Sequence, residues 1–381
     1  MYSEKLEDLL KDGYTRKYAQ FYLNILEEEK NNSNYDQSFV SWSHSRGFRA
    51  EVASIYGIND NNCSDYLTDY DYYRIWPINS WERIWINDKM TLKYILSGTA
   101  FDSLMPEYYY YSTPNGLRPL MDNPYKNENN GLSSFCKLLK ERGAFACKPC
   151  NGSTSVGFFK LSFSSDGNYY IDNTIINEER IKKVIEENPN YVFTEYIHPN
   201  PFFSKMNETI HTLRLVTVNE NGYSPRIIGG YLRIPHLSDS SANFIHFDSV
   251  ENYNIVADVN PETGEFGDTK LVYFDRVEDV LIHPDTGVPV SGIIENYEEL
   301  RDSIIGVAKL FNTIEFMGFD IGVTDKGFKC MEINSHPGIG HMQLFHPFLA
   351  DSEIGDYFKK KIAYINSLSE IQKNQRINIP R

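Results

Sequence analysis

The chain has 381 residues, of which 41% are hydrophobic, and its formal net charge is −15. With 27 tyrosines and 23 phenylalanines it can bury two or three sizeable cores, which excludes a disordered protein. The negative charge disfavours nucleic acid and anionic membrane surfaces as partners, because binding to either requires basic patches.

The N-terminal part of the chain is predicted to be helical and rich in aromatic residues. Residues 1–30 show the apolar periodicity of helices, with mixed charge. Residues 31–86 are irregular, and tyrosine and tryptophan recur between Trp42 and Trp85. Aromatic runs usually form core, and the alternative is a platform on which a sugar ring stacks. A helix is expected next, from Lys89 to Leu96.

The start of the chain, its apolar runs and its cysteines indicate the cellular compartment of the protein. The start of the chain lacks the basic and apolar regions of a signal peptide, and no apolar run approaches the roughly 18 residues of a membrane helix, so we expect a cytoplasmic protein without membrane insertion. The five cysteines are odd in number and scattered, which argues against a disulfide framework. Cys147 and Cys150 match C-x-x-C, but no second pair accompanies them, and we interpret the match as coincidence.

A lysine before a loop of small residues is the first feature with chemical meaning. A strand ends at Lys148-Pro149, a loop rich in glycine, serine and threonine runs to Gly157, and a second strand follows. Small residues let backbone N–H groups approach a phosphate, and the lysine adds a point charge. Because the lysine precedes the loop, this is not the loop of P-loop enzymes. Lys160, on the second strand, is expected to matter little if its side chain points to solvent.

Strands with short turns are predicted over 144–172 and 191–235, and a helix over 297–311. Polar residues after the predicted strands could contact a substrate, although such residues are more often structural and satisfied by hydrogen bonds. They are His198, Asn200, Ser204 and Asn207 in one connection, Arg233, Asn243 and His246 in another, and His336 and His341 near the end.

The segment from Phe319 to Ser335 is predicted to be a β-hairpin that carries hard oxygen ligands. Glu332 and Asn334 are two residues apart on a strand and therefore share a face, and Asp320 can lie opposite them. Such oxygen donors suit Mg²⁺. The alternative is an ordinary hairpin with surface acids, but charges that interrupt an apolar strand need partners.

Taken together, these segments resemble the ATP-grasp superfamily. The nearer resemblance is to its sugar-transfer-associated branch, which is found in polysaccharide gene clusters. It is carried by His211-Thr212-Leu213-Arg214, His283-Pro284-Asp285-Thr286-Gly287 and Asn334-Ser335-His336-Pro337-Gly338. The resemblance implies an α+β fold in which two α+β lobes grip ATP, preceded by the helical, aromatic-rich N-terminal region.

Four segments are expected on this basis. Residues 1–86 form the N-terminal region, 87–196 the N-lobe, 197–350 the C-lobe with the metal site, and 351–381 a helical tail.

The resemblance also implies a role for each site residue. Lys148 and Lys89 would contact the ATP phosphates, and Arg214 would face the transferred phosphoryl group, so that Lys148 and Arg214 are the catalytic residues. The loop residues that would fold over the phosphates are Gly152, Ser153, Thr154, Ser155 and Gly157; the hinge that reads adenine is Glu195, Tyr196 and Ile197; and the ligands of one or two Mg²⁺, with Mn²⁺ as a substitute, are Asp320, Glu332 and Asn334. The loop has fewer glycines than is common in the family.

The implied reaction is ATP-dependent ligation of a small-molecule carboxylate to an amine. A carboxylate resists attack by an amine until its conversion to an acyl phosphate removes its charge and supplies a leaving group. Metal, lysine and arginine would neutralise charge during the transfer. In this branch, one substrate is expected to be a sugar or an amino acid destined for a surface polysaccharide. The alternatives are a small-molecule kinase and a nucleotide-binding protein without catalysis.

Overall fold

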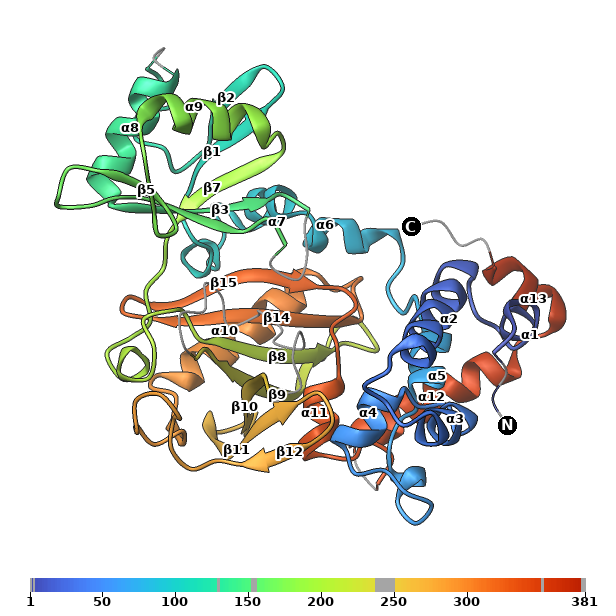
Figure 1. The fold of residues 1–381 in the computed structure, drawn as a ribbon. Coiled ribbons are helices and arrows are strands. Elements are labelled where there is room, and N and C mark those ends of the chain that lie inside the picture. Colours follow the sequence, from blue (N-terminus) through green and yellow to red (C-terminus); the bar gives the residue numbers. More distant parts are fainter. Residues whose placement is uncertain are drawn as a thin grey trace.

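The computed structural model describes residues 2, 4–128, 131–151, 156–236, 251–350 and 353–377. Two antiparallel sheets lie one above the other, and helices from both ends of the chain stand together at the side of the second sheet (Figure 1). The predicted α+β class is confirmed, and so is the helical, aromatic-rich N-terminal region. None of the described helices is both long and apolar enough to cross a membrane.

The first sheet has seven strands in the order β2-β1-β7-β3-β4-β5-β6. Helices α8 and α9 pack on one face, where Leu139 and Ile185 meet Phe145 and Phe193. The elements are β1 (Tyr108–Thr113), β2 (Gly116–Pro119), α8 (Gly131–Arg142), β3 (Ala144–Pro149), β4 (Phe159–Phe163), β5 (Tyr169–Ile171), β6 (Thr174–Ile176), α9 (Glu178–Glu187) and β7 (Tyr191–Glu195). The opposite face carries Lys148, because side chains alternate along a strand.

The second sheet has eight strands, ordered β12-β11-β10-β9-β8-β14-β15 with β13 paired to β11. Its elements are β8 (Thr212–Val218), β9 (Arg226–Ile234), β10 (Tyr253–Val259), β11 (Glu265–Tyr273), β12 (Val277–Asp279), β13 (Gly292–Ile293), α10 (Tyr297–Leu310), β14 (Phe316–Thr324) and β15 (Gly327–Asn334). Ile304 and Val307 of α10 pack against Leu215 and Phe319, so α10 covers one face. Every residue of β14 is buried, which places this strand in the core.

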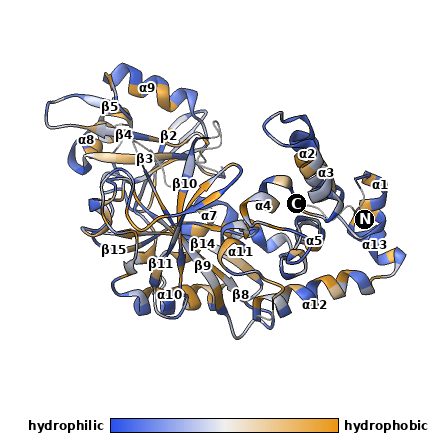
Figure 2. Cartoon of the chain, turned by 60° about the horizontal axis from the view of Figure 1, so that its bottom comes forward, coloured by the Kyte–Doolittle hydropathy of each residue, from blue (hydrophilic) through white to orange (hydrophobic). Residues whose placement is uncertain are grey.

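Helices from both chain ends cover part of the other face of the second sheet. They are α1 (Leu6–Lys11), α2 (Arg16–Asn31), α3 (Gln37–Ser45), α4 (Ala50–Ile55), α5 (Asp69–Ile75), α11 (Gly340–Phe345), α12 (Glu353–Ser367) and α13 (Glu370–Arg376). Two further helices, α6 (Ile84–Asn87) and α7 (Lys89–Leu96), lie between the two sheets, where α6 contacts β15 (Figure 1). Hydrophobic residues recur along α12 (Figure 2), and Tyr357 and Phe358 of this helix pack with Trp76 and Phe316. Most of the aromatic run therefore forms core. Helices α3, α4 and α5 interrupt the stretch predicted to be irregular, and at six to nine residues they are too short to show a clear period.

One buried asparagine joins the N-terminal region to both ends of the hairpin. The Asn79 side chain is 2% exposed; it accepts hydrogen bonds from the backbone N–H groups of Glu315 and Phe316, at 2.9 and 3.1 Å. Its amide donates to the carbonyl oxygens of Phe316 and Ser335, at 2.7 and 3.1 Å. The start of β14 and the end of β15 are thus held at a fixed separation.

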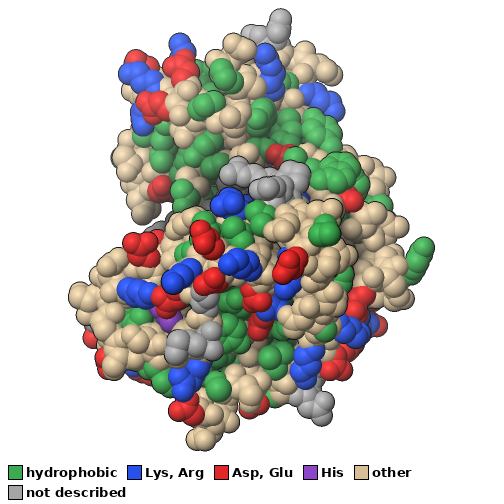
Figure 3. Space-filling model, turned by 90° about the vertical axis from the view of Figure 1, so that its right-hand side faces the viewer, with side chains coloured by type: hydrophobic (Ala, Val, Ile, Leu, Met, Phe, Trp, Pro, Cys, Tyr) green, Lys and Arg blue, Asp and Glu red, His purple; other side chains and the backbone are tan. Residues whose placement is uncertain are grey.

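The surface on the side of these helices has no single sign of charge. Figure 3 shows acidic and basic side chains next to one another across its lower part. Exposed pairs of opposite charge occur on the protein, such as Lys360 with Glu220 at 3.6 Å. Isolated exposed pairs of this kind stabilise a fold by only about 0–1 kcal/mol each.

Candidate functional site

The hairpin β14–β15 brings the three predicted metal ligands together. Asp320 lies directly opposite Glu332, and Gly318 opposite Asn334, with a bulge between Asp320 and Ile321. The Asn334 Nδ2 atom lies 3.3 Å from Asp320 Oδ2 and 3.3 Å from Glu332 Oε1. Two carboxylates and one amide therefore converge on a single point of the sheet.

Arg214 completes this group from the neighbouring strand. It lies opposite Asp320 in the pairing of β8 with β14. Its Nη2 donates to Asp320 Oδ2 at 2.8 Å, and its Nε donates to the other carboxylate oxygen. Burial alone would raise the pKa of Asp320, but the guanidinium outweighs burial and holds that pKa below its usual value. Asp320 is thus ionised, and it fixes the direction of Arg214.

The electrostatics of Glu332 fit a bound divalent cation. Burial, and then the adjacent Asp320 carboxylate, raise the pKa of Glu332 above its usual value. Lys89 Nζ, 3.5 Å from Glu332 Oε2, opposes this shift. A bound cation would reduce the repulsion between two carboxylates that lie so close together, and Mg²⁺ binds hard oxygen donors of this kind. The Asn334 amide would turn its oxygen toward the ion, since the two orientations of an amide are interchangeable.

Two lysines reach this group from the first sheet and from α7. Lys148 is half-buried near the end of β3, and burial together with the nearby Lys89 ammonium lowers its pKa to about 8. Glu332 also acts on this pKa, in the opposite direction. The backbone N–H of Lys89 donates to Cys150 O at 3.2 Å, which ties the start of α7 to the chain just beyond β3. A pair of cations thus faces a pair of carboxylates.

The predicted phosphate loop is described only in part. Gly152, Ser153, Thr154 and Ser155 lie outside the described residues. Gly157 has φ +80°, and a Cβ there would overlap the Tyr191 hydroxyl and lie 3.1 Å from Pro149 Cγ. Only glycine suits this position. The end of the loop therefore packs beside the strand that carries Lys148.

The predicted hinge leads from the first sheet to the second. Glu195 ends β7, and its carboxylate accepts a hydrogen bond from the Glu107 N–H at 3.3 Å. Ile197 packs against β14, where a Cβ on Gly322 would lie 3.0 Å from Ile197 Cδ1. Tyr196 lies under the Lys160 ammonium, which is 4.4 Å from the ring centroid.

Lys160 lies on the same sheet face as Lys148, a placement that the sequence did not indicate. It pairs with Ala146 across β3 and β4, and Ala146 and Lys148 are two apart on β3. The two lysines therefore share the face of the first sheet that is turned away from α8 and α9. The side chain is half-buried rather than directed to solvent. The register between β3 and β4 depends on the shape of the loop that joins them, which the sequence does not give. The common face of Lys148 and Lys160 could therefore not be predicted.

Several other polar residues have structural roles. Asn200 Oδ1 accepts from Phe203 N at 2.9 Å, and Ser204 Oγ donates to Asn200 O at 3.0 Å, so this connection satisfies its own polar groups. Asn243 and His246 lie outside the described residues.

The C-x-x-C match does not form a site. Cys147 packs in the core beneath α8, whereas Cys150 contacts Asp88 Oδ2 at 3.2 Å. Among the described residues, no group of three or more histidine, cysteine and acidic side chains could hold a metal. The proposed Mg²⁺ ligands are two acids and an amide, which is a different donor set.

The comparisons with known proteins assign the family. Residues 80–348 match the family described as sugar-transfer associated ATP-grasp. Because the match covers more than half of the chain, the protein belongs to this family and is an ATP-grasp protein. A search of curated proteins finds no relative of the sequence.

Solved structures with a distantly similar fold include a synthetase and two ligases. D-alanyl-alanine synthetase A from Vibrio cholerae has 14% identity and a TM-score of 0.41, over 74% of this chain and 65% of that chain. L-amino acid ligase from Bacillus licheniformis has 10% identity and a TM-score of 0.36, over 68% of this chain and 42% of that one. D-alanine–D-alanine ligase from Bacillus anthracis has 16% identity and a TM-score of 0.33, over 74% and 68%. The chain thus spans less than two thirds of the first two, and the family assignment rests on residues 80–348.

Proposed function

We propose that the protein is an ATP-dependent carboxylate–amine ligase that forms an amide through an acyl phosphate and releases ADP and phosphate. The observation that carries the proposal is the meeting of Lys148 and Lys89 with the group of Arg214, Asp320, Glu332 and Asn334. Cations that suit phosphates thereby lie next to oxygens that suit a metal ion.

The division of roles follows from these positions. Lys148 and Lys89 would bind the phosphates of ATP, while Asp320, Glu332 and Asn334 would hold Mg²⁺ or Mn²⁺. When bound, the metal ion would neutralise charge on the transferring phosphoryl group. Arg214, directed by Asp320, would face the phosphoryl group as it is transferred to the carboxylate. Preorganised charges of this kind account for most of the catalysis of phosphoryl transfer.

A covalent enzyme intermediate is not part of this proposal. Cys330 is the thiol on β15 nearest to Glu332 in sequence, and it donates to the Glu332 carbonyl oxygen at 3.5 Å. Burial raises the pKa of Cys330 well above its usual value, so the thiol stays neutral and is a poor nucleophile. The acyl phosphate would therefore form directly on the substrate.

Oxygen transfer tests the mechanism. A panel of sugar acids and amino acids, each labelled with heavy oxygen in its carboxylate, is incubated with MgATP and an amine. We expect one labelled oxygen atom in the released phosphate, because the amine displaces the oxygen that was phosphorylated. Formation of AMP and pyrophosphate, or release of unlabelled phosphate, would contradict the proposal. A stable phosphorylated product that needs no amine would establish a kinase instead.

The role in surface polysaccharide synthesis rests on the sugar-transfer description of the family. The identity of neighbouring genes tests it. Genes for glycosyltransferases and sugar-nucleotide enzymes are expected beside this one, and a neighbourhood without them would count against the role.

A further inference from the structure

A cavity of about 360 Å³ lies between α4 and the second sheet, beside the candidate site. Tyr231 connects the two, because it lines the cavity and lies opposite Arg214 in the pairing of β8 with β9. The Arg214 guanidinium is 5.9 Å from the centroid of the Tyr231 ring. The cavity therefore opens on the face of the sheet that carries Arg214 and Asp320. It lies at β9, which is one strand further from Glu332 than Arg214 is.

The sheet side of the cavity is positively charged and aromatic. Arg233 is two residues from Tyr231 on β9 and shares its face, with the guanidinium 5.6 Å from the Tyr231 ring centroid. His341 packs edge-on against Tyr231 at 5.0 Å between ring centroids. Burial, together with Arg233 and Arg214, holds the pKa of His341 well below its usual value, so the imidazole is neutral. The Arg233 guanidinium can form an ion pair with an anionic group, and the Tyr231 ring can stack on a ring of a ligand.

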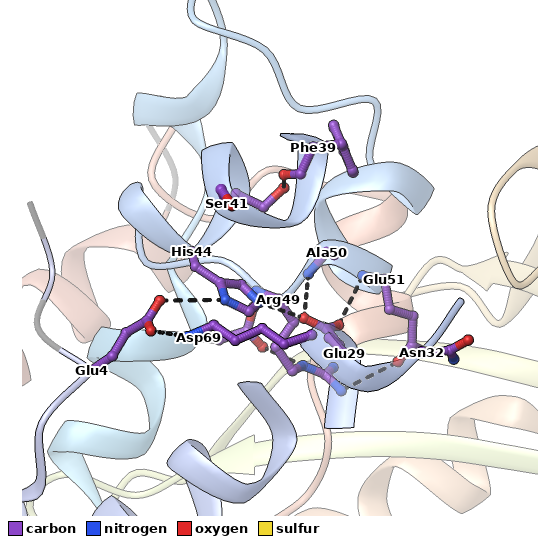
Figure 4. A network of polar contacts seen from close by, with 12 residues as sticks. Glu4, Glu29, Asn32, Phe39, Ser41, His44, Arg49, Ala50, Glu51 and Asp69 are labelled. Carbon is purple, nitrogen blue, oxygen red and sulfur yellow. Dashed lines mark hydrogen bonds and ion pairs between the residues drawn. The ribbon is translucent and has the colours of Figure 1, made fainter. Parts of the chain in front are cut away.

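The opposite wall is held in place by a buried network (Figure 4). Glu29 accepts hydrogen bonds from the backbone N–H groups of Ala50 and Glu51, at 2.8 and 3.0 Å, and it contacts His44 Nε2 at 2.8 Å. These bonds satisfy N–H groups in the first turn of α4, which otherwise have no partner within the helix. The network thereby fixes the direction of α4 toward the sheet.

The charged and aromatic side chains that line this wall are held in place by hydrogen bonds and ion pairs. Arg49 Nε donates to Asp69 Oδ1 at 2.9 Å, and Glu51 lies 3.4 Å from Arg49 Nη1. Tyr56 donates from its hydroxyl to Gly340 O at 2.7 Å, which joins the end of α4 to the start of α11. A cavity whose walls are braced in this way binds a ligand with little loss of conformational entropy.

We propose that this cavity binds the organic acid of the ligase reaction, a molecule the size of one monosaccharide or amino acid, an inference that rests on the proposed function. The anionic group of the molecule lies toward Arg233, and its ring or apolar face lies between Tyr56 and Tyr231. Glu51 accepts a hydrogen bond from a hydroxyl or an amine. The volume is at the small end of the roughly 300–1,000 Å³ of ligand pockets, which favours a single building unit over a polymer chain.

Binding of named small acids to the full-length protein in the presence of MgADP tests this assignment. The probes are glucuronate, galacturonate, D-alanine and L-glutamate, with glucose and galactose as neutral partners of the two sugar acids. We expect at least one acid to bind, and its binding to weaken at least tenfold in Arg233→Met. Arg226→Met is the matched control, because Arg226 lies at the other end of the same strand and pairs with Glu220 at 3.2 Å. It should leave acid binding unchanged.

A second variant acts without removing a charge. Val52→Phe fills the cavity from α4 and should abolish acid binding, while an unchanged affinity for ADP shows that the fold is intact. Failure of every acid to bind, binding of glucose as tight as that of glucuronate, or acid binding that persists in both variants would each overturn the proposal. If ATP binds and is consumed with some other acid that Val52→Phe does not affect, the cavity assignment fails while the ligase survives. If acids bind at Arg233 but ATP does not bind, the ligase proposal fails instead.

Discussion

Arg214 and Asp320 lie opposite each other on adjacent strands and share two hydrogen bonds, one of them 2.8 Å long between Nη2 and Oδ2. Asp320 is 1% exposed and Arg214 is 8% exposed. A single carboxylate thus serves as a proposed metal ligand and as the partner that directs a proposed phosphoryl-binding cation. The two acids of the hairpin are consequently not equivalent. Asp320 pairs with an arginine of the same sheet, whereas the cation beside Glu332 is Lys89, which belongs to α7.

Replacement of each hairpin acid by its amide should separate stability from chemistry. Asp320→Asn leaves a buried guanidinium without its counter-charge, and we expect the free energy of unfolding to fall by about 3–5 kcal/mol. Glu332→Gln removes a charge that Asp320 repels and Lys89 attracts. Because these two effects oppose each other, the free energy of unfolding should change by less than about 1 kcal/mol, while Mg²⁺-dependent ATP consumption is lost. Urea unfolding measures the change in stability, and formation of ADP measures ATP consumption. Near-normal ATP consumption by Glu332→Gln would contradict the metal assignment.

Nucleotide binding should depend on the protonation of Lys148. Its pKa is lowered to about 8, so the ammonium is present below that pH and lost as the pH rises through it. Phosphates favour the charged form, and ADP affinity should therefore fall above pH 8, at up to about tenfold per pH unit. In Lys148→Arg the cation persists, and the affinity should be flat between pH 8 and pH 10. Calorimetric titration with MgADP at several pH values measures this, and an identical decline in both proteins would contradict it.

Methionine substitutions should rank the lysines of the first sheet. Lys148→Met should weaken ADP binding by about 10- to 100-fold, corresponding to a charge-assisted contact of about 1.5–3 kcal/mol. Lys160→Met should have a smaller but measurable effect, because the ammonium stacks on Tyr196 of the predicted hinge on the same face. Lys182→Met, on the exposed side of α9, is the control and should be neutral. An affinity unchanged in Lys160→Met would show that this face does not extend the nucleotide site.

Loss of the Asn79 side chain should loosen the hairpin from the N-terminal region. Asn79→Ala leaves buried backbone groups of Phe316 and Ser335 unsatisfied, at a cost of about 1–3 kcal/mol for each group. Thermal unfolding should report a clear loss. Asn24→Ala, which removes an exposed contact with Gln20, should leave the stability unchanged. Equal stability of the two variants would mean that Asn79 does not link the two parts.

The hairpin and the lysine before the loop were predictable because their signals are local. Alternation along a strand places Glu332 and Asn334 on one face, and a hairpin turn places Asp320 opposite them. The relation of Lys160 to Lys148 depends instead on the register across a loop. The approach of α4 to Tyr231 depends on packing between segments about 180 residues apart, and the buried Glu29 that fixes α4 resembles any other helical glutamate in the sequence.

The core that Trp76, Phe316 and Phe358 share has a consequence for the boundaries of the protein. The family match spans residues 80–348, yet Trp76 precedes it and Phe358 follows it. A fragment trimmed to the matched residues would lose three aromatic partners of Phe316, which are Trp76, Tyr357 and Phe358, and would expose apolar strand surface to water. We therefore expect the smallest unit able to fold to be longer than the matched residues, and expression of the matched residues alone should yield aggregate.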